Sequence, residues 1–331
     1  MKTPPTEDLR QSTEYADYMR RRGWEVGKLK ASSEKGKVNY FVKKLPLIGS
    51  VVKIQHPQAV PLKNELDTLA KRHRALFVKI EPAISHPPLA GSYLQADTWP
   101  LLPSKTLHLN LAQPEELLWE KLDPDARYSI RKAGKTLAIT TYQLSAPSNK
   151  ARAALQQLAE LLKGTGRNKG FTAPKWKDLQ AKAECFGEKA WLIMASGQEK
   201  SSHYPIEGNT NNPDSNNSTA DSVECGQPYA GCLLLAHDGV AYYHHAASSP
   251  EGRKLLSGYP VLWEAIKLAQ GLGCHTFDFE GVYDHRFPKA TRNCEGFTYF
   301  KKKFGGKEIE FPTPLVKYYS PLMRLLFKLF G

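Results

Sequence analysis

The chain has 331 residues, of which 41% are hydrophobic, so it can bury one large core or two medium ones, and its length favours two domains. Its 46 Lys and Arg against 33 Asp and Glu give a net charge of +13, which favours nucleic acid, nucleotide-linked substrates or anionic lipid headgroups as partners, with simple solubility as the alternative. The N-terminus lacks an apolar signal region and no run reaches the roughly 18 apolar residues that span a bilayer, so we expect a cytoplasmic protein.

The first part of the chain alternates helix and strand patterns. Tyr15, Tyr18 and Met19 recur at helical spacing in TEYADYMRRRGW, which predicts a short helix ended by Gly23. Two β-rich runs, an amphipathic helix and an apolar strand stopped by proline follow. We expect these at residues 37–45 and 49–55 (strands), 57–75 (helix) and 76–82 (strand).

The second part repeats this order after a proline-rich connector. It contains a strand at 106–111, a helical pattern at 114–135, a helix at 151–167, strands at 190–196 and at 229–248 around an Asp-Gly turn, a helix at 259–273 and a strand at 276–282. The repeated order predicts an α+β fold with two similar halves, each a mixed sheet flanked by helices.

Residues 197–227 interrupt the second half with Asn, Ser, Gly and Pro and almost no large apolar side chains. Such a segment cannot bury enough surface to offset the entropy lost on ordering. We therefore expect a disordered insertion within a hairpin of two adjacent strands.

Two basic clusters are candidates for binding or chemistry. Arg127, Arg131 and Lys135 lie four residues apart on one predicted helix face, where they could meet phosphates or form a solvated surface. The second cluster, GFTYFKKKFGGKEIEF at 296–311, places three lysines between phenylalanines before a Gly-Gly pair. One lysine could point inward and stabilise an oxyanion, or the segment could be a basic β-hairpin with three solvated lysines.

Motifs of several other chemistries are missing. The sequence contains no G-x-x-x-x-G-K-[ST], no G-x-S-x-G and no H-E-x-x-H. Its five cysteines include no C-x-x-C pair, which argues against a disulfide framework or a zinc site. His244 and His245 are adjacent in a predicted strand, so alternation would point them to opposite faces. A transferase or a binding protein that works by positioning and charge remains.

Several motifs occur in an order that is typical of one family. PVLWEAIKLAQGLGCHTFDFEGVYD and GFTYFKKKFGG combine a Trp-Glu-Ala helix, an Asp-Phe-x-Gly strand and a Gly-Phe-x-x-Phe-Lys-x-x-Phe-Gly-Gly closure. Upstream stand Gln11-Ser12 and an R-x-x-I-R-K-A segment at 127–133. Together they resemble the Fem family (FemA, FemB and FemX type), the aminoacyltransferases of peptidoglycan interpeptide bridges. Two departures are IQHPQAVP at 54–61, in place of Pro-x-Gly-Pro, and Met19, in place of a substrate-binding lysine.

The resemblance implies two GNAT-like (acetyltransferase-like) domains, with the C-terminal strands returning to the first. We therefore expect a first domain of residues 1–143 and 308–331 and a second domain of residues 144–307. The implied reaction transfers an amino acid from aminoacyl-tRNA, the co-substrate, to an amine on the stem peptide of a peptidoglycan precursor. This precursor is lipid II or its UDP-linked form, and the resemblance implies no cofactor and no metal ion.

The resemblance also implies site residues. Lys301 matches the family's Phe-Lys pair and is expected to stabilise the tetrahedral oxyanion. The expected substrate-binding residues are Thr172, Lys175, Tyr243, His245, Asp278 and Phe300, with Tyr243 and His245 on one side of the strand. Candidates for tRNA or phosphate contact are Arg127, Arg131 and Lys132, while Lys302 and Lys303 would be solvated or touch tRNA phosphate.

Two further segments carry expectations. Asp278 and Glu280 lie two residues apart in a strand expected to stop at Gly281 beside the transfer groove, where they would shape its charge or anchor Arg286 and Lys289 of the next loop. An anchor is favoured over a base for Asp278. The C-terminal YYSPLMRLLFKLFG is apolar apart from two cations on one face, which predicts a helix on the inner membrane leaflet or packed on the first domain.

Two alternative functions stay open. An acyl-CoA-dependent GNAT N-acyltransferase would share the fold, although GRKLLSGYPVLW has bulky side chains where a Gly-rich turn would cradle pyrophosphate. A non-enzymatic tRNA- or membrane-binding protein would require Lys301 and the strand of Asp278 to be structural only.

Overall fold

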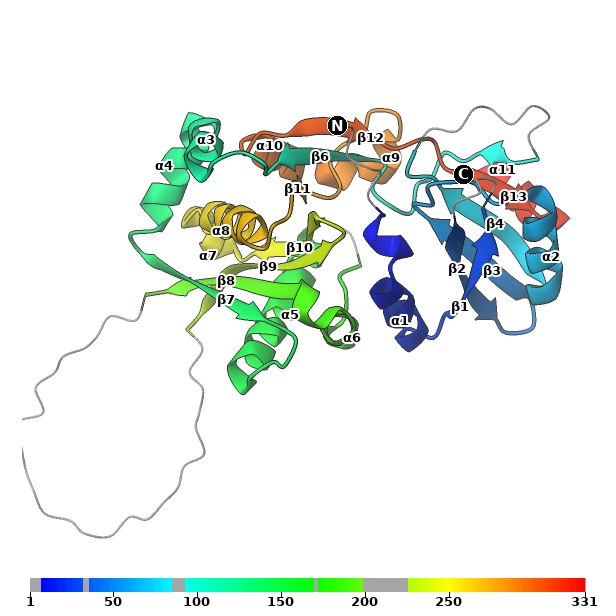
Figure 1. Ribbon diagram of the computed structural model, residues 1–331, viewed down its shortest axis with the longest axis horizontal. Helices are drawn as coiled ribbons and strands as arrows, with labels where there is room; N and C mark the ends of the chain where they lie inside the picture. Colours follow the sequence, from blue (N-terminus) through cyan, green and yellow to red (C-terminus); the bar gives the residue numbers. More distant parts are fainter. Residues whose placement is uncertain (1–6, 32–35, 85–92, 170–171, 199–225, 331) are drawn as a thin grey trace, which may run out of the picture.

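The computed structural model describes residues 7–31, 36–84, 93–169, 172–198 and 226–330. Two mixed sheets, each flanked by helices, lie along the longest axis of the molecule (Figure 1). The predicted arrangement of two mixed sheets with helices on their faces is therefore confirmed. Among the described residues, every helix falls short of the length and apolar character that crossing a bilayer requires.

The first sheet has the strand order β1-β2-β3-β4-β13-β5. Its strands are β1 (Glu25–Lys30), β2 (Lys37–Leu45), β3 (Gly49–Gln55), β4 (Ala75–Glu81), β5 (Gln95–Ala96) and β13 (Leu315–Tyr318). Helix α2 (Lys63–His73) covers one face, where its Leu66 and Leu69 pack with Val52, Ile54 and other strand residues. β2 and β3 begin and end where the sequence predicts, and the predicted helix and last strand of this part form α2 and β4.

The second sheet has the strand order β12-β6-β11-β10-β9-β8-β7. Its strands are β6 (Lys105–Asn110), β7 (Leu137–Gln143), β8 (Ala190–Gly197), β9 (Pro228–His237), β10 (Val240–Ser248), β11 (Thr276–Asp278) and β12 (Lys307–Glu310). One face packs on α5 (Asn149–Lys169) and α6 (Trp176–Phe186). The other packs on α3 (Glu115–Glu120), α4 (Pro124–Ala133) and α8 (Gly258–Gly271).

Shorter elements complete the fold. They are α7 (Pro250–Lys254), α9 (Pro288–Thr291), α10 (Glu295–Lys302), α11 (Pro321–Phe330) and three 3-10 segments, Leu9–Gln11, Gly187–Lys189 and Arg292–Cys294. The predicted Asp-Gly turn joins β9 to β10: Asp238 and Gly239 both have positive φ, +46° and +73°, as a two-residue hairpin turn requires.

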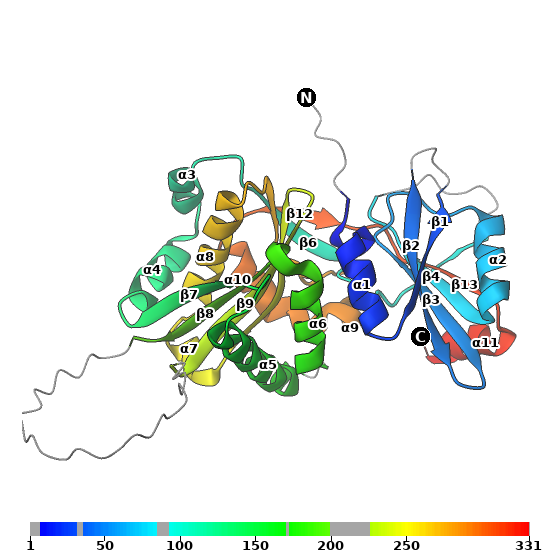
Figure 2. The ribbon, with the colours of Figure 1, turned by 60° about the horizontal axis from the view of Figure 1, so that its bottom comes forward.

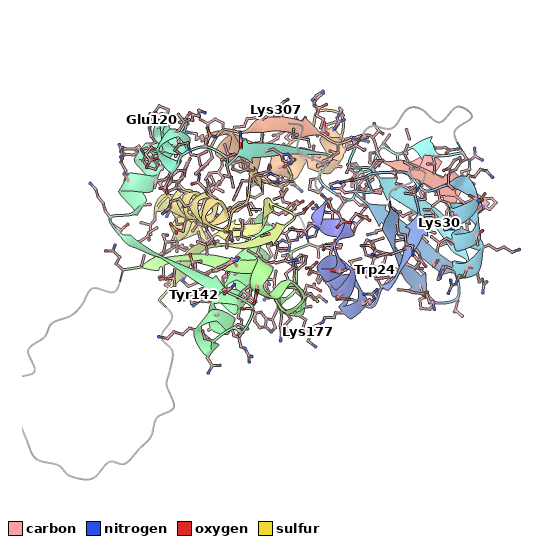
Figure 3. All side chains as sticks on the ribbon, viewed as in Figure 1. Trp24, Lys30, Glu120, Tyr142, Lys177 and Lys307 are labelled. Atoms are coloured by element: carbon pink, nitrogen blue, oxygen red, sulfur yellow. The ribbon has the colours of Figure 1, made fainter. Side chains whose placement is uncertain are left out.

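Helix α1 (Thr13–Arg21) lies between the two sheets (Figure 2). Ser12 caps its N-terminus by accepting a hydrogen bond from the amide of Tyr15 at 3.0 Å. Tyr15 and Tyr18 belong to the same core as helices α5 and α6 of the second domain, and Phe41 of β2 joins them. Trp24, which follows the helix, packs against this core (Figure 3). Helix α1 therefore packs in the core of the second domain and contacts the first sheet through Phe41.

The sheets divide the chain at different places from those expected. The predicted boundary at residue 143 is corrected, because β6 and β7, at 105–110 and 137–143, hydrogen-bond within the second sheet. The expected return at residue 308 comes later, since β12 pairs with β6 of the second sheet and only β13 enters the first. The return of a C-terminal strand to the first sheet is confirmed.

The predicted insertion joins two neighbouring strands, because β8 and β9 pair antiparallel. The expectation of disorder falls on residues 199–225, which lie outside the described residues. Two other segments differ from the prediction. Helix α6 was not predicted, and residues 295–302 form helix α10, so the alternative of a basic β-hairpin is wrong.

Candidate active site

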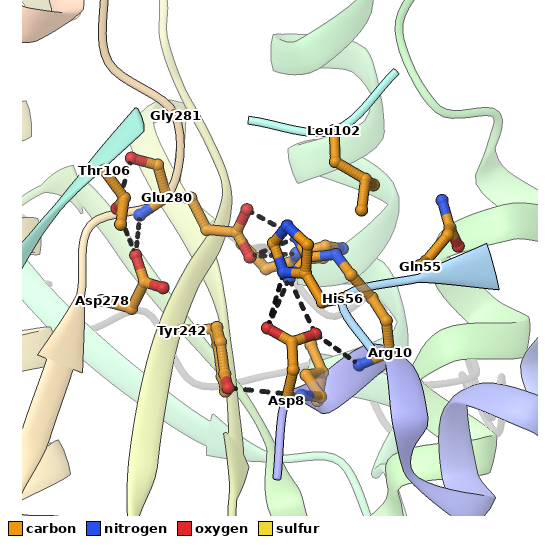
Figure 4. A network of polar contacts seen from close by, with 12 residues as sticks. Asp8, Arg10, Gln55, His56, Leu102, Thr106, Tyr242, Asp278, Glu280 and Gly281 are labelled. Atoms are coloured by element: carbon orange, nitrogen blue, oxygen red, sulfur yellow. Dashed lines mark hydrogen bonds and ion pairs between the residues drawn. The ribbon is translucent and has the colours of Figure 1, made fainter. Parts of the chain in front are cut away.

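A buried set of charged side chains joins the two domains (Figure 4). At its centre Arg10 donates from Nη2 to both carboxylate oxygens of Glu280, at 2.9 and 2.8 Å. Its Nη1 lies 3.4 Å from Oδ1 of Asp8, whose Oδ2 lies 2.9 Å from Nδ1 of His56. We call these four residues the interdomain network. It ties the start of the chain and the end of β3 to the segment after β11.

The charges of the interdomain network outweigh the cost of burying them. Burial alone would raise the pKa of Glu280, but Arg10 and a hydrogen bond from His244 lower it to about 2. Burial likewise opposes ionisation of Asp8, but His56 and Arg10 hold the pKa of this carboxyl well below its usual range. Both carboxylates are therefore ionised at neutral pH.

His56 lies in the stretch that departs from the family's Pro-x-Gly-Pro. It takes a left-handed backbone conformation, with φ +48°, directly after β3. Its amide donates to the carbonyl of Glu81 at 2.7 Å, and its ring centroid lies 4.2 Å from that of Phe311, in the segment between β12 and β13. The substituted stretch thus supplies a side chain to the interdomain network.

Asp278 anchors the turn that aims Glu280 at Arg10. Its Oδ1 accepts hydrogen bonds from the amide of Glu280, at 2.7 Å, and from the hydroxyl of Thr106, and its Oδ2 lies 3.2 Å from Nε2 of His108. Glu280 has a φ of +60°, which a non-glycine residue adopts only when its surroundings fix it. Asp278 supplies that constraint.

The preference for Asp278 as an anchor rather than a base agrees with these contacts, but two details of the prediction are wrong. The strand ends at Asp278 instead of Gly281. The loop cation Arg286 pairs with Asp284 at 2.7 Å and not with either predicted carboxylate. Strand alternation therefore does not describe Asp278 and Glu280, because the left-handed residue ends the extended backbone.

Strand β10 contains a β-bulge at His244. Tyr243 and His245 pair with consecutive residues of β9, so His244 is the extra residue between them. The two histidine rings lie with their centroids 4.3 Å apart, and both Nε2 atoms approach Nζ of Lys182 on α6, at 2.6 Å for His244 and 3.0 Å for His245. The expectation that the histidines face opposite sides is wrong, because alternation fails at a bulge.

Burial gives this lysine–histidine cluster unusual electrostatics. It lowers the pKa of Lys182 to about 7, with Glu280 opposing the effect and Arg10 adding to it. Burial and the nearby Lys182 lower the pKa of His244 to about 4 and that of His245 well below its usual value. Around neutral pH both imidazoles are therefore neutral, and the charge of Lys182 changes.

Lys301 points inward from α10. Its Nζ donates to the carbonyl of Gly281 at 2.7 Å, and burial lowers its pKa. Phe300 on the same helix and Phe304, just after the end of the helix, contact Tyr259 with ring centroids 5.0 and 6.0 Å away, and this aromatic packing fixes the helix. Lys301 thus reaches the residue that follows Glu280, beside the interdomain network.

The other two lysines of the cluster have carboxylate partners. Lys302 lies 2.7 Å from Glu308, and Lys303 lies 2.7 Å from Asp125 and is only 8% exposed. Lys303 is therefore neither solvated nor placed to meet tRNA phosphate, which corrects the prediction for this residue. Its ion pair joins α10 to the start of α4.

The remaining predicted substrate-binding residues do not converge. Tyr243 and Phe300 belong to the core between the second sheet and α8, so the expectation that Tyr243 shares a groove with His245 is wrong. Thr172 and Lys175 are exposed in the segment before α6. Only Asp278 and His245 lie at the candidate site, His245 through its contact with Lys182.

The predicted phosphate contacts lie elsewhere. Figures 1 and 2 place α4 at the end of the second domain that faces away from the first. Arg131 and Lys132 are exposed there, while Arg127 donates to the carbonyls of Glu120 and Leu122, at 2.5 and 3.1 Å. The α4 face is therefore separate from the candidate site.

One group of side chains among the described residues brings metal-ligand atoms together. Asp284, His285 and Glu310 have ligand atoms within 4.8 Å of one another. Arg286 pairs with Asp284 at 2.7 Å and lies 3.8 Å from Glu310, so the guanidinium of Arg286 supplies the positive charge beside these two carboxylates.

Sequence reasoning missed four contributors to this region, Asp8, Arg10, His56 and Lys182. The first three have no local pattern, because Arg10 and Glu280 are 270 residues apart. Lys182 gave a usable signal: it lies in KWKDLQAKAECF between Leu179 and Phe186, which keep helical spacing and are buried.

Comparisons with known proteins agree with this architecture. The FemAB family model matches residues 203–330. A crystal structure of FemX is 19% identical, with a TM-score of 0.71 over 98% of this chain and 95% of that chain. The C-terminal domain (DUF2156) of a putative lysylphosphatidylglycerol synthetase from Agrobacterium fabrum is 12% identical, with a TM-score of 0.57 over 97% and 93%. A conserved protein of unknown function from Bacteroides thetaiotaomicron is 9% identical, with a TM-score of 0.55 over 96% and 92%. The comparison with curated proteins gives no match.

The similarity to FemX agrees with the expected architecture of two domains, each with a mixed sheet flanked by helices. The family match contains Asp278, Glu280 and Lys301, and so includes the part of the candidate site that follows β11. The FemAB family model thus matches the last part of the chain, residues 203–330, and the fold of nearly the whole chain is similar to that of FemX.

Proposed function

We propose that this protein is an aminoacyltransferase that moves an amino acid from aminoacyl-tRNA to an amine on the stem peptide of a peptidoglycan precursor, either lipid II or its UDP-linked form. The family match and the FemX-like fold support peptidoglycan bridge formation in general. The observation that carries the proposal is Lys301, a half-buried lysine on α10 whose amine reaches the segment after β11.

The transfer reaction mainly requires the protein to align the two substrates and to supply a positive charge. An aminoacyl ester is already activated, so the enzyme must bring the amine to the carbonyl carbon and stabilise the oxyanion that forms. The ammonium of Lys301 has three N–H donors, so it can hold the carbonyl of Gly281 and also donate to an oxyanion. The packing of Phe300 and Phe304 fixes the helix that carries this charge.

The test is transfer of a labelled amino acid from charged tRNA to lipid II and to the UDP-linked precursor. We expect Lys301→Ala to lower the rate about 10²- to 10³-fold, the usual cost of removing one oxyanion donor. Lys302→Ala is the matched control, because Lys302 is exposed, pairs with Glu308 and is expected to leave the rate within a few fold. Full activity of folded Lys301→Ala would contradict the proposed role.

The same assay separates the two rivals. Transfer from acyl-CoA with no response to charged tRNA would identify a GNAT N-acyltransferase. Binding of tRNA or vesicles without transfer of any acyl group would identify a binding protein. The exposed Arg131 and Lys132 on α4 are the residues we propose for contact with the tRNA backbone, since phosphate contacts come from solvent-facing cations.

We also propose that α11 contacts the inner face of the cell membrane. Leu322, Leu325 and Phe327 are 62%, 56% and 44% exposed, which is unusual for large apolar side chains on one short helix. Phe327 still contacts Phe77 and Tyr318 of the first sheet, with ring centroids 5.8 and 5.6 Å away. The helix is thus held on the first domain while apolar side chains face outward, where a lipid-linked acceptor would be delivered.

A further inference from the structure

The transfer reaction proposed above also needs a group that takes a proton from the attacking amine, and Lys301 does not supply one. The lysine–histidine cluster is a candidate, because His244 contacts Glu280 and Lys301 contacts the next residue, Gly281. Lys182 is 4% exposed, and among the described residues no carboxylate forms an ion pair with it. A buried lysine that contacts only two imidazoles through hydrogen bonds is set up to exchange a proton.

The hydrogen bonds of the cluster are consistent with two protonation states. In both, His244 donates from Nδ1 to Glu280, at 3.3 Å, and accepts at Nε2 from Lys182. When Lys182 is an ammonium, it also donates to Nε2 of His245, whose Nδ1 then carries the hydrogen. When Lys182 is a neutral amine, its lone pair accepts from Nε2 of His245, and Nδ1 of His245 has a free lone pair.

We propose that His245 is the general base of the transfer reaction, and that Lys182 is the positioning residue that sets its tautomer and receives its second proton. The half-buried ring of His245 would touch the amine, while Lys182 acts through that ring. This inference rests on the proposed function, because it assigns the proton transfer of the same reaction.

The proton movements balance. The neutral amine attacks the ester carbonyl and a C–N bond forms. The amine nitrogen passes a proton to Nδ1 of His245, and the Nε2 proton of His245 passes to Lys182. The tetrahedral intermediate then collapses, the C–O bond to the ribose breaks, and the ribose oxygen takes the proton back from Nδ1 while Lys182 returns a proton to Nε2. The products are an amide and the hydroxyl of the tRNA, and the cluster regains its first state.

The charged and titratable groups around Lys182 are compatible with this cycle. The ring of Tyr18 on α1 lies 4.7 Å from Nζ of Lys182. Two arginines that flank α1 in the sequence, Arg10 and Arg22, lower the pKa of Lys182. Asp178, one turn earlier on α6, raises it. With Glu280 and the two histidines they leave Lys182 with a pKa of about 7, because burial outweighs the carboxylates. Both protonation states are therefore populated near neutral pH.

The first experiment is the pH dependence of single-turnover transfer. The unaltered chain is expected to react faster as the pH rises through about 7, because Nδ1 of His245 has a free lone pair only when Lys182 is neutral. Lys182→Met and His245→Gln are expected to be about 10²- to 10⁴-fold slower at neutral pH and to lose this inflection. Lys182→Arg stays charged, so it is expected to be as slow as Lys182→Met.

Lys177→Met is the matched control, since Lys177 lies exposed at the outer side of the same helix (Figure 3). It is expected to keep both the rate and the inflection. If Lys182→Met transfers at the full rate with an unchanged pH profile, the proposed general base is wrong while the proposed function stands. Absence of transfer by the unaltered chain would overturn the proposed function and the base with it.

A second measurement does not depend on activity. In protein labelled with ¹³C at lysine Cε, the resonance that Lys182→Met removes is expected to titrate near pH 7, and to shift when His244→Leu removes a hydrogen-bond partner. Titration above pH 9 would overturn the proposal even if the variants were inactive through misfolding.

Discussion

The pair of Arg10 and Glu280 carries the sharpest prediction about stability. Arg10 is 4% exposed and binds Glu280 through two hydrogen bonds, so Arg10→Met removes the arginine that pairs with this buried carboxylate. Removing one member of a buried pair typically costs about 3 to 5 kcal/mol. Lowering the pKa of Glu280 from 4.5 to about 2 corresponds to roughly 3 kcal/mol, which agrees with that range. We therefore expect Arg10→Met to lower the free energy of unfolding by about 3 kcal/mol at pH 7.

Urea denaturation followed by tryptophan fluorescence measures this loss. Arg20→Met is the control, because Arg20 and Asp17 form an exposed pair worth less than about 1 kcal/mol. A folded carboxyl with a lowered pKa stabilises above its unfolded value of 4.5 and loses that contribution as the pH falls through about 2. The difference between Arg10→Met and the unaltered chain should therefore shrink below pH 4.5, and adding Glu280→Gln should recover part of the loss. A loss no larger than that of Arg20→Met would refute the reasoning.

Two further predictions concern packing and the membrane. Gly252→Ala should lower the free energy of unfolding by about 1 to 3 kcal/mol, since a methyl group there would clash with the backbone oxygen of Tyr229. Gly164→Ala in α5 meets open space and should raise the free energy of unfolding by roughly 0.5 to 1 kcal/mol. Thermal denaturation of both variants shows whether the two changes in stability have opposite signs. Leu325→Glu should weaken flotation with anionic vesicles several-fold, because it removes an exposed apolar side chain of α11. Leu47→Glu, in the turn between β2 and β3 where the leucine is fully exposed, should not weaken it, and equal binding of both variants would contradict a role for α11.

Local patterns were sufficient for much of the fold. Strands β2 and β3 could be bounded from the sequence because Pro46 and Gly49 separate their β-rich runs. The turn at Asp238 and Gly239 follows from residues that tolerate positive φ. The domain boundary could not be found in this way, because membership of a sheet depends on pairing between distant strands, as in β6 with β11 and β12.

The candidate site was less accessible to sequence reasoning. Lys301 was found through a motif, but its contact with Gly281 depends on how α10 packs. His244 and His245 were assigned to opposite faces, because a bulge is set by the register with β9 and leaves no mark in the local sequence. Lys182 was missed because helix α6 was not predicted, although Leu179 and Phe186 keep helical spacing around it.

The position of β13 has a consequence for synthesis of the chain. It hydrogen-bonds to β4 on one side and to β5 on the other, in the interior of the first sheet. As the polypeptide leaves the ribosome, β4 and β5 therefore emerge more than two hundred residues before the strand that joins them. The first domain can reach its final form only after residue 318 has left the exit tunnel, so the domain made first is completed last.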